Sequence, residues 1–136
     1  MQGGDISNEV PKRIAVTLDC VVDKTVTTKK LFKLIPVEDV AVHYNRVALS
    51  KFWDFSYKMG VVLELVTFGM FQKEADEVLE DLNNLGTNPF SYVKAYDAVS
   101  VLVSEMPYRP ELLGVVDIPE RALRYGSKYV DIWRAI

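Results

Sequence analysis

The sequence predicts an α/β domain built around a largely parallel β-sheet. Short runs of β-branched and apolar residues, typical of buried strands, alternate along the chain with segments in which apolar residues recur at three- and four-residue spacing, typical of helices. A helix between two strands allows them to run parallel in one sheet. The chain has 136 residues, 49% of them apolar, which is enough for one hydrophobic core without metal or disulfide support.

Composition and charge argue against several classes of protein. The net charge is −3, with Lys and Arg scattered among Asp and Glu, so we expect no nucleic-acid partner. Residues 1–12 are expected to be a polar leader and residues 13–136 one domain, with no signal peptide and no apolar run long enough to span a bilayer. One histidine, His43, and one cysteine, Cys20, cannot build a zinc site of the usual composition. We therefore expect a soluble, intracellular and cytoplasmic protein without membrane contact.

The first part of the chain predicts a strand, a hairpin and a helix. Arg13–Asp19 is a nearly continuous apolar run that ends on an acid, as a buried strand does. Cys20–Pro36 has two short apolar clusters around a lysine-rich centre and predicts a small hairpin. From Val37 to Met59 the apolar spacing predicts a helix that ends at Gly60.

The second part continues the alternation. Val61–Val66 predicts a buried strand, and Phe71–Leu85 a helix that ends before Gly86. The nearly continuous apolar residues between Ser91 and Val103 predict one or two further strands. Beyond a loop we expect a strand at Leu112–Asp117, a short helix at Glu120–Tyr125 and a last strand or terminal extension at Tyr129–Trp133.

Polar residues stand where three of the predicted strands end. They are Thr17 with Asp19, Thr67, and Asp117. Ligands of open parallel sheets bind beyond the carboxyl ends of the strands, because loops and helix N-termini gather there. We therefore expect these four side chains to lie at one edge of the sheet and to form the candidate site.

The residues around the first strand resemble a known motif. Arg13–Asp23, RIAVTLDCVVD, is similar to the first motif of the haloacid dehalogenase superfamily, an apolar strand followed by Asp-x-Asp-Gly and two apolar residues. In this register Thr17 stands in place of the nucleophilic Asp, Asp19 in place of the acid/base Asp, and Cys20 in place of the Gly. The resemblance implies a three-layer Rossmann-like domain with a hairpin flap after the first strand and no cap domain.

Later motifs of the family have weaker counterparts. Thr67 stands where the second motif has Ser or Thr, and Asp117 where the fourth motif has its metal-binding acid. Arg109 or Lys94 is the candidate for the lysine of the third motif, and Glu120 is the nearest candidate for the second acid of the fourth. Both of these counterparts depart from the usual pattern of the family.

Thr17 changes what the resemblance implies about activity. In the family the first Asp attacks phosphorus and helps to hold Mg²⁺, whereas a threonine hydroxyl is neutral at pH 7 and a poor ligand for that ion. We therefore expect a catalytically degenerate member. Asp117 and Asp19 are expected to bind Mg²⁺ weakly at best, no other cofactor is expected, and Cys20 is expected to be a buried inert thiol.

Aromatic residues indicate a contact surface. Phe52 and Phe55 fit the core face of the predicted helix, whereas Trp53 and Tyr57 fall outside it and suit a second surface, covered either by a partner or by the C-terminal segment folding back. The same reasoning applies to the tail residues Tyr125, Tyr129 and Trp133. Since Tyr and Trp are enriched in interface cores, the leading hypothesis is a noncatalytic module that binds a protein partner, or a second copy of itself, through Trp53, Tyr57 and Trp133.

Two other functions stay open. One is a Mg²⁺-dependent phosphohydrolase, with Asp19 as acid/base, Asp117 on the metal, and Thr67 and Arg109 on phosphate. The other is a sensor that binds a small phosphorylated ligand without cleaving it. The same residues also have structural explanations, because Thr17 suits a strand and carboxylates at strand ends often cap the next element.

Overall fold

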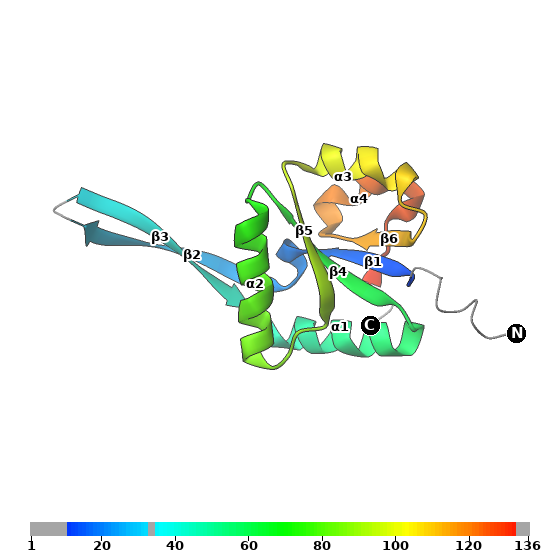
Figure 1. The fold of residues 1–136 in the computed structure, drawn as a ribbon, viewed down its shortest axis with the longest axis horizontal. Helices are drawn as coiled ribbons and strands as arrows, with labels where there is room; N and C mark the ends of the chain where they lie inside the picture. The colour runs from blue at the N-terminus through cyan, green and yellow to red at the C-terminus, as the bar shows by residue number, and fades with distance from the viewer. Residues whose placement is uncertain (1–10, 33–34, 133–136) are drawn as a thin grey trace, which may run out of the picture.

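The computed structural model describes residues 11–32 and 35–132. Its centre is a sheet of four parallel strands in the order β5-β4-β1-β6. The strands are β1 (Arg13–Thr17), β4 (Val62–Phe68), β5 (Phe90–Tyr96) and β6 (Leu112–Val116). The helices are α1 (Arg46–Met59), α2 (Gln72–Leu85), α3 (Val99–Glu105) and α4 (Ala122–Tyr125). The predicted α/β domain with a parallel, Rossmann-like sheet and flanking helices is confirmed (Figure 1).

Alternate residues of the central strands build two separate cores. Ile14 and Val16 of β1 pack toward α1 and α2, together with Phe52 of α1. Ala15, on the opposite face of the same strand, packs toward α3 and α4, where it meets Leu102. The helices therefore cover both faces of the sheet, which explains why its strands read as continuous apolar runs instead of alternating ones.

Local signals set the ends of the long helices. The side chain of Asn45 accepts a hydrogen bond of 3.0 Å from the backbone N–H of Ala48 and caps the N-terminus of α1. Gly60 and Gly86 follow α1 and α2 with φ angles of +63° and +75°, a conformation in which other residues are strained. The predicted helix ends at these two glycines are confirmed.

The predicted start of the first helix is wrong. Residues from Ile35 to Tyr44 form strand β3, which pairs antiparallel with β2 (Val22–Phe32). The hairpin is longer than predicted and extends away from the parallel sheet (Figure 1). The apolar spacing after Val37 suits a helix locally, but the backbone of this segment is hydrogen-bonded to a partner strand instead, and Asn45 starts the helix only afterwards.

Of the one or two strands predicted between Ser91 and Val103, one is confirmed as β5 and the other is a helix. The segment Val99–Val103 belongs to α3, and its inward residues Val99, Leu102 and Val103 follow helical spacing against the second core. The strand at Leu112–Val116 and the short helix before Gly126 are as predicted.

The chain after α4 runs along the edge of β6. The 3-10 helix η5 (Gly126–Lys128) is followed by a single parallel bridge between Tyr129 and Val115, so the C-terminal segment is an extension with one bridge. Gly114 makes this approach feasible, since a Cβ there would lie 2.8 Å from the carbonyl oxygen of Lys128 and 2.6 Å from a methyl of Val130. Within the described part of the chain, no helix has the length and apolarity needed to cross a bilayer.

Candidate functional site

Three of the predicted site residues lie together where β1 and β6 end. Thr17 is the last residue of β1 and Asp117 directly follows β6, and both are fully buried. Asp19 lies in the 3-10 helix η2 (Leu18–Cys20) that continues β1, and its side chain is 56% exposed. The parallel pairing of β1 with β6 brings these two strand ends side by side, which is the arrangement that the sequence predicts.

Asp117 is the centre of a dense set of hydrogen bonds. The Thr17 hydroxyl donates to its Oδ1 at 2.7 Å, the Tyr125 hydroxyl to Oδ2 at 2.5 Å, and the backbone N–H of Ile118 to Oδ1 at 2.7 Å. The guanidinium of Arg121 donates from Nε to Oδ2 at 2.8 Å and from Nη2 to Oδ1 at 2.9 Å. Both carboxylate oxygens of Asp117 are therefore satisfied by the protein itself.

Arg121 also joins the second carboxylate. Its Nη2 donates to Oδ2 of Asp19 while the same guanidinium holds Asp117. One cation thus lies between the two acids that were expected to bind Mg²⁺. Sequence reasoning missed Arg121, because the backbone between it and Asp117 is extended at Ile118 and forms only the short 3-10 helix Pro119–Arg121, so no regular helix signals this ion pair.

The site residues do not fit a magnesium ion in this arrangement. Mg²⁺ binds through carboxylate oxygens and water in octahedral geometry, and the oxygens of Asp117 already accept from Thr17, Tyr125 and Arg121. Glu120, the candidate second acid, is exposed in the 3-10 helix η4 (Pro119–Arg121). Among the described residues, no group of three or more His, Cys, Asp or Glu side chains is placed to hold a metal.

The hydrogen bonds also set the protonation state of Asp117. Burial by itself would raise the pKa of this carboxyl, but the hydrogen bonds from Arg121, Thr17, Tyr125 and the Ile118 N–H outweigh it and hold the pKa below its ordinary value. A carboxylate with a low pKa is a weak base. Asp117 is therefore poorly suited to take the proton of the Thr17 hydroxyl, even at 2.7 Å.

Cys20 lies beside Thr17 as a buried thiol. Its Sγ is 3.5 Å from Oγ1 of Thr17 and donates to the carbonyl oxygen of Val116 at 3.8 Å. Burial raises its pKa to about 12, so the thiolate that nucleophilic chemistry needs is scarce at pH 7. His43 is exposed on β3 of the hairpin, and not on the first helix as predicted.

Thr67 lies near the end of the neighbouring strand β4 and is also buried. Val66, the residue before it, is the register partner of Thr17. The Thr67 hydroxyl has no hydrogen-bond partner within the part of the chain that the structure describes. The structure thus brings Thr67 to the same edge of the sheet, without joining it to the hydrogen bonds of Asp117.

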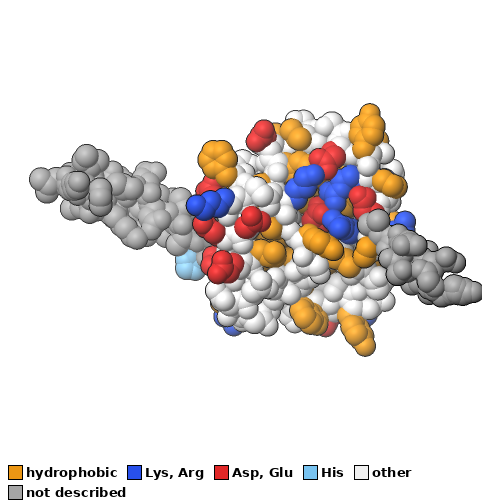
Figure 2. Space-filling view, in the orientation of Figure 1, with side chains coloured by type: hydrophobic (Ala, Val, Ile, Leu, Met, Phe, Trp, Pro, Cys, Tyr) orange, Lys and Arg blue, Asp and Glu red, His pale blue; other side chains and the backbone are white. Residues whose placement is uncertain are grey.

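Arg109, a predicted phosphate residue, is held by a different carboxylate. Its Nη1 and Nη2 donate to the two oxygens of Glu64, each at 2.8 Å, and Glu64 is 2% exposed. Arg13 adds a bond of 3.0 Å to the same carboxylate. Lys94, the other candidate for the third motif, pairs with Glu105 at 2.6 Å. Figure 2 shows Lys and Arg side chains interleaved with Asp and Glu on the face that carries α3.

The predicted contact residues on α1 are exposed. Trp53 is 56% and Tyr57 86% exposed, whereas Phe52 and Phe55 are buried as predicted. Trp53 and Tyr57 line a pocket of about 320 Å³ together with Asn88 and Pro89, which precede β5. Trp133 lies outside the described residues.

Two of the tail aromatics are buried or half-buried by the chain itself, not exposed for a partner. Tyr125 is 5% exposed, and its hydroxyl donates to Asp117. Tyr129 is half-buried, and its hydroxyl donates to the backbone oxygen of Asp117 at 3.1 Å. The short helices between Pro119 and Lys128 bring both rings back against Asp117.

Comparison of the sequence with models of known protein families finds no match, and comparison with curated proteins finds none either.

Proposed function

We propose that this chain is a noncatalytic domain of the haloacid dehalogenase type that works by binding a protein partner. The observation that carries the proposal is the bridge made by Arg121 between Asp19 and Asp117. An enzyme of that type needs an ionised nucleophile, which together with the acid of the fourth motif holds a divalent cation. Here a threonine stands at the position of the nucleophile, and the guanidinium of Arg121 binds Asp117, the counterpart of that acid.

The protonation states of Thr17, Asp117 and Cys20 support the absence of catalytic activity. The Thr17 hydroxyl donates a hydrogen bond to Asp117. Because the pKa of Asp117 is lowered, this carboxylate is too weak a base to activate the hydroxyl. The neighbouring thiol of Cys20 is also largely protonated at pH 7, with a pKa of about 12. Neither side chain is activated as a nucleophile, and removing one member of such a unit costs orders of magnitude in rate.

The first test measures magnesium binding and the hydrolysis of an aryl phosphate. We expect the wild type to bind no Mg²⁺ at millimolar concentration and to release no phosphate. Thr17→Asp alone is expected to stay inactive, since Arg121 still pairs with the acids. Thr17→Asp combined with Arg121→Ser restores three carboxylates without the competing cation, and we expect it to bind Mg²⁺ in a calorimetric titration.

The matched control combines Thr17→Asp with Arg124→Ser. Arg124 is an exposed arginine of α4 and its removal leaves the bridge intact, so this variant is expected to bind no Mg²⁺. Hydrolysis by the wild type that is lost in Asp19→Asn would overturn the proposal in favour of a phosphohydrolase.

A second candidate function is the binding of a small phosphorylated ligand without turnover. The observation in its favour is the buried hydroxyl of Thr67, which lacks a partner among the described residues and which a phosphate oxygen would satisfy. Inorganic phosphate in the same calorimeter distinguishes the two: saturable binding by the wild type that Thr67→Val removes would favour this candidate.

The surface of Trp53 and Tyr57 supports the protein-binding part of the proposal. The two side chains are one helical turn apart on the outer side of α1 and border a pocket. Exposed Trp and Tyr beside a hollow match the anchors that dominate protein interfaces.

The second test is a photocrosslink in the cells that produce the chain. With p-benzoylphenylalanine in place of Tyr57, we expect an adduct of one defined mass, from a second copy or from another protein, that Trp53→Ala abolishes. The same probe in place of Glu80, which is exposed on α2, is the control and is expected to give no adduct. Equal labelling at both positions would contradict a specific surface on α1.

A further inference from the structure

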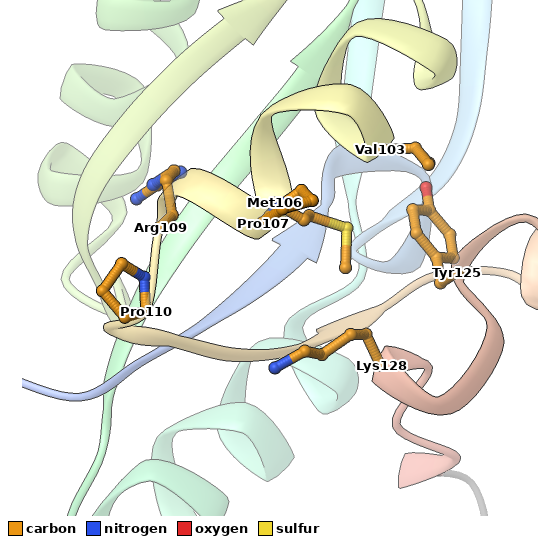
Figure 3. A pocket seen from close by; sticks show the side chains of 7 residues that line it. All are labelled: Val103, Met106, Pro107, Arg109, Pro110, Tyr125 and Lys128. Atoms are coloured by element: carbon orange, nitrogen blue, oxygen red, sulfur yellow. The ribbon is translucent and has the colours of Figure 1, made fainter.

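A second pocket lies on the opposite face of the sheet. It measures about 410 Å³ and is lined by residues from α3, the 3-10 helix η3 (Met106–Tyr108), α4 and η5. Figure 3 shows Val103, Met106 and Tyr125 around one space, with the side chain of Lys128 below it and its amine directed toward the Pro110 end of the pocket. This volume falls in the range of pockets that hold small molecules, roughly 300–1,000 Å³.

The walls of this pocket are apolar. Val103, Met106, Pro107 and Pro110 contribute aliphatic groups, and Met adapts well to ligand shape. Tyr125 presents its ring, because its hydroxyl is bonded to Asp117 at 2.5 Å. A ligand therefore has to bring an apolar group to this space.

Arg109 lines the pocket without offering a free charge. Its guanidinium is held by the two oxygens of Glu64, each at 2.8 Å, and Figure 3 shows it pointing away from Met106 and Tyr125. Arg109 therefore contributes its aliphatic stem to the wall of the pocket. Its charge is neutralised by Glu64 and is not available to a ligand.

Lys128 supplies that charge from a fixed backbone. The carbonyl of Lys128 lies against Gly114, and the following residues are tied to β6 by the bridge between Tyr129 and Val115 and by a bond of 2.8 Å from Val130 N to Val115 O. Lys128 is exposed, and its ammonium makes no ion pair or hydrogen bond with other described residues. The pocket thus combines an apolar interior with a single unpaired cation.

We propose that this pocket binds a small amphipathic carboxylate, with its apolar chain between Met106 and Tyr125 and its carboxylate on the ammonium of Lys128. A single cation matches a monoanion. Tight recognition of a phosphate dianion uses several charged or backbone donors, which this lining lacks. The pocket lies across the sheet from Trp53 and Tyr57, so the binding is independent of the proposed partner surface.

The test is an amide NMR titration of the wild-type chain with octanoate at pH 7, compared with the neutral octanamide. We expect saturable shifts at Met106, Tyr125 and Lys128, with a dissociation constant for octanoate on the order of a millimolar. Octanamide is expected to bind about threefold to fivefold more weakly, which is the upper part of the range for one exposed ion pair.

Two variants and a control complete the experiment. Lys128→Gln is expected to remove the difference between octanoate and octanamide, whereas Lys51→Gln, an exposed lysine of α1, keeps it. Val103→Phe fills the pocket and is expected to weaken both ligands. Equal affinity of both ligands for the wild type, shifts confined to residues outside the pocket, or a Lys128→Gln variant that still prefers octanoate each overturn the proposal.

Discussion

Replacing Arg121 with methionine is expected to lower the free energy of unfolding by about 3 kcal/mol at pH 7. The change leaves the carboxylate of Asp117, which is fully buried, without its only described cation, and breaking a buried ion pair costs about 3–5 kcal/mol. Asp19 adds little to this loss because its side chain is 56% exposed. Urea denaturation followed by circular dichroism measures the effect.

The dependence of this loss on pH identifies its cause. In the wild type the pKa of Asp117 is below that of the unfolded chain, so its contribution is present above about pH 4 and is lost as pH falls through the lower folded pKa. In Arg121→Met burial prevails and the folded pKa of Asp117 rises. The folded variant then takes up a proton more readily than the unfolded chain, so the gap to the wild type is expected to shrink as pH falls from 7 toward 4.

Arg124→Met is the matched control, because it removes an exposed arginine from the same short helix. We expect it to change the free energy of unfolding by less than about 0.5 kcal/mol at any pH. A loss in Arg121→Met that is constant between pH 7 and pH 4 would speak against the ion pair and for a simple packing defect.

Phe52→Ala is expected to lower the free energy of unfolding by about 3–5 kcal/mol, while Trp53→Ala changes it by less than about 0.5 kcal/mol. Phe52 is fully buried between α1 and the sheet, with its ring centroid 6.5 Å from that of Phe90. Trp53, the next residue of the helix, is 56% exposed. Both variants are measured by urea denaturation at pH 7.

The comparison of Phe52 with Trp53 also separates stability from function. Since Trp53→Ala is expected to leave the fold intact, a lost photocrosslink in that variant reports on the contact surface alone. A large loss of stability in Trp53→Ala would instead identify Trp53 as part of the core and remove the main support for a partner on α1.

The first strand, the long helices and their C-terminal ends were predictable because their signals are local. A continuous apolar run such as Ile14–Val16 identifies a strand covered on both faces, and Gly60 and Gly86 adopt positive φ angles that end helices wherever the chain goes next. The segment from Ile35 to Tyr44 failed because its apolar spacing fits a helix as well as a strand. The choice between helix and strand was made by pairing with β2. Most residues of β3 pair with a β2 residue that lies ten or more positions earlier in the sequence.

The meeting of Thr17 with Asp117 was predictable from strand order, since the carboxyl ends of neighbouring parallel strands share one edge. The bridge made by Arg121 was not predicted. It depends on the turn at Ile118 that sends the chain back over the end of β6. The burial of Glu64 between Arg13 and Arg109 depends likewise on residues far apart in sequence.

Local patterns were enough to predict the alternation of strands and helices and the gathering of polar residues at one edge of the sheet, because hydrophobic periodicity and helix-ending glycines act over a few residues. Which charge faces Asp117 depends instead on the tertiary fold. The long side chain of Arg121 can contact several acids, and the packing of segments far apart in the sequence places Asp19 and Asp117 within its reach.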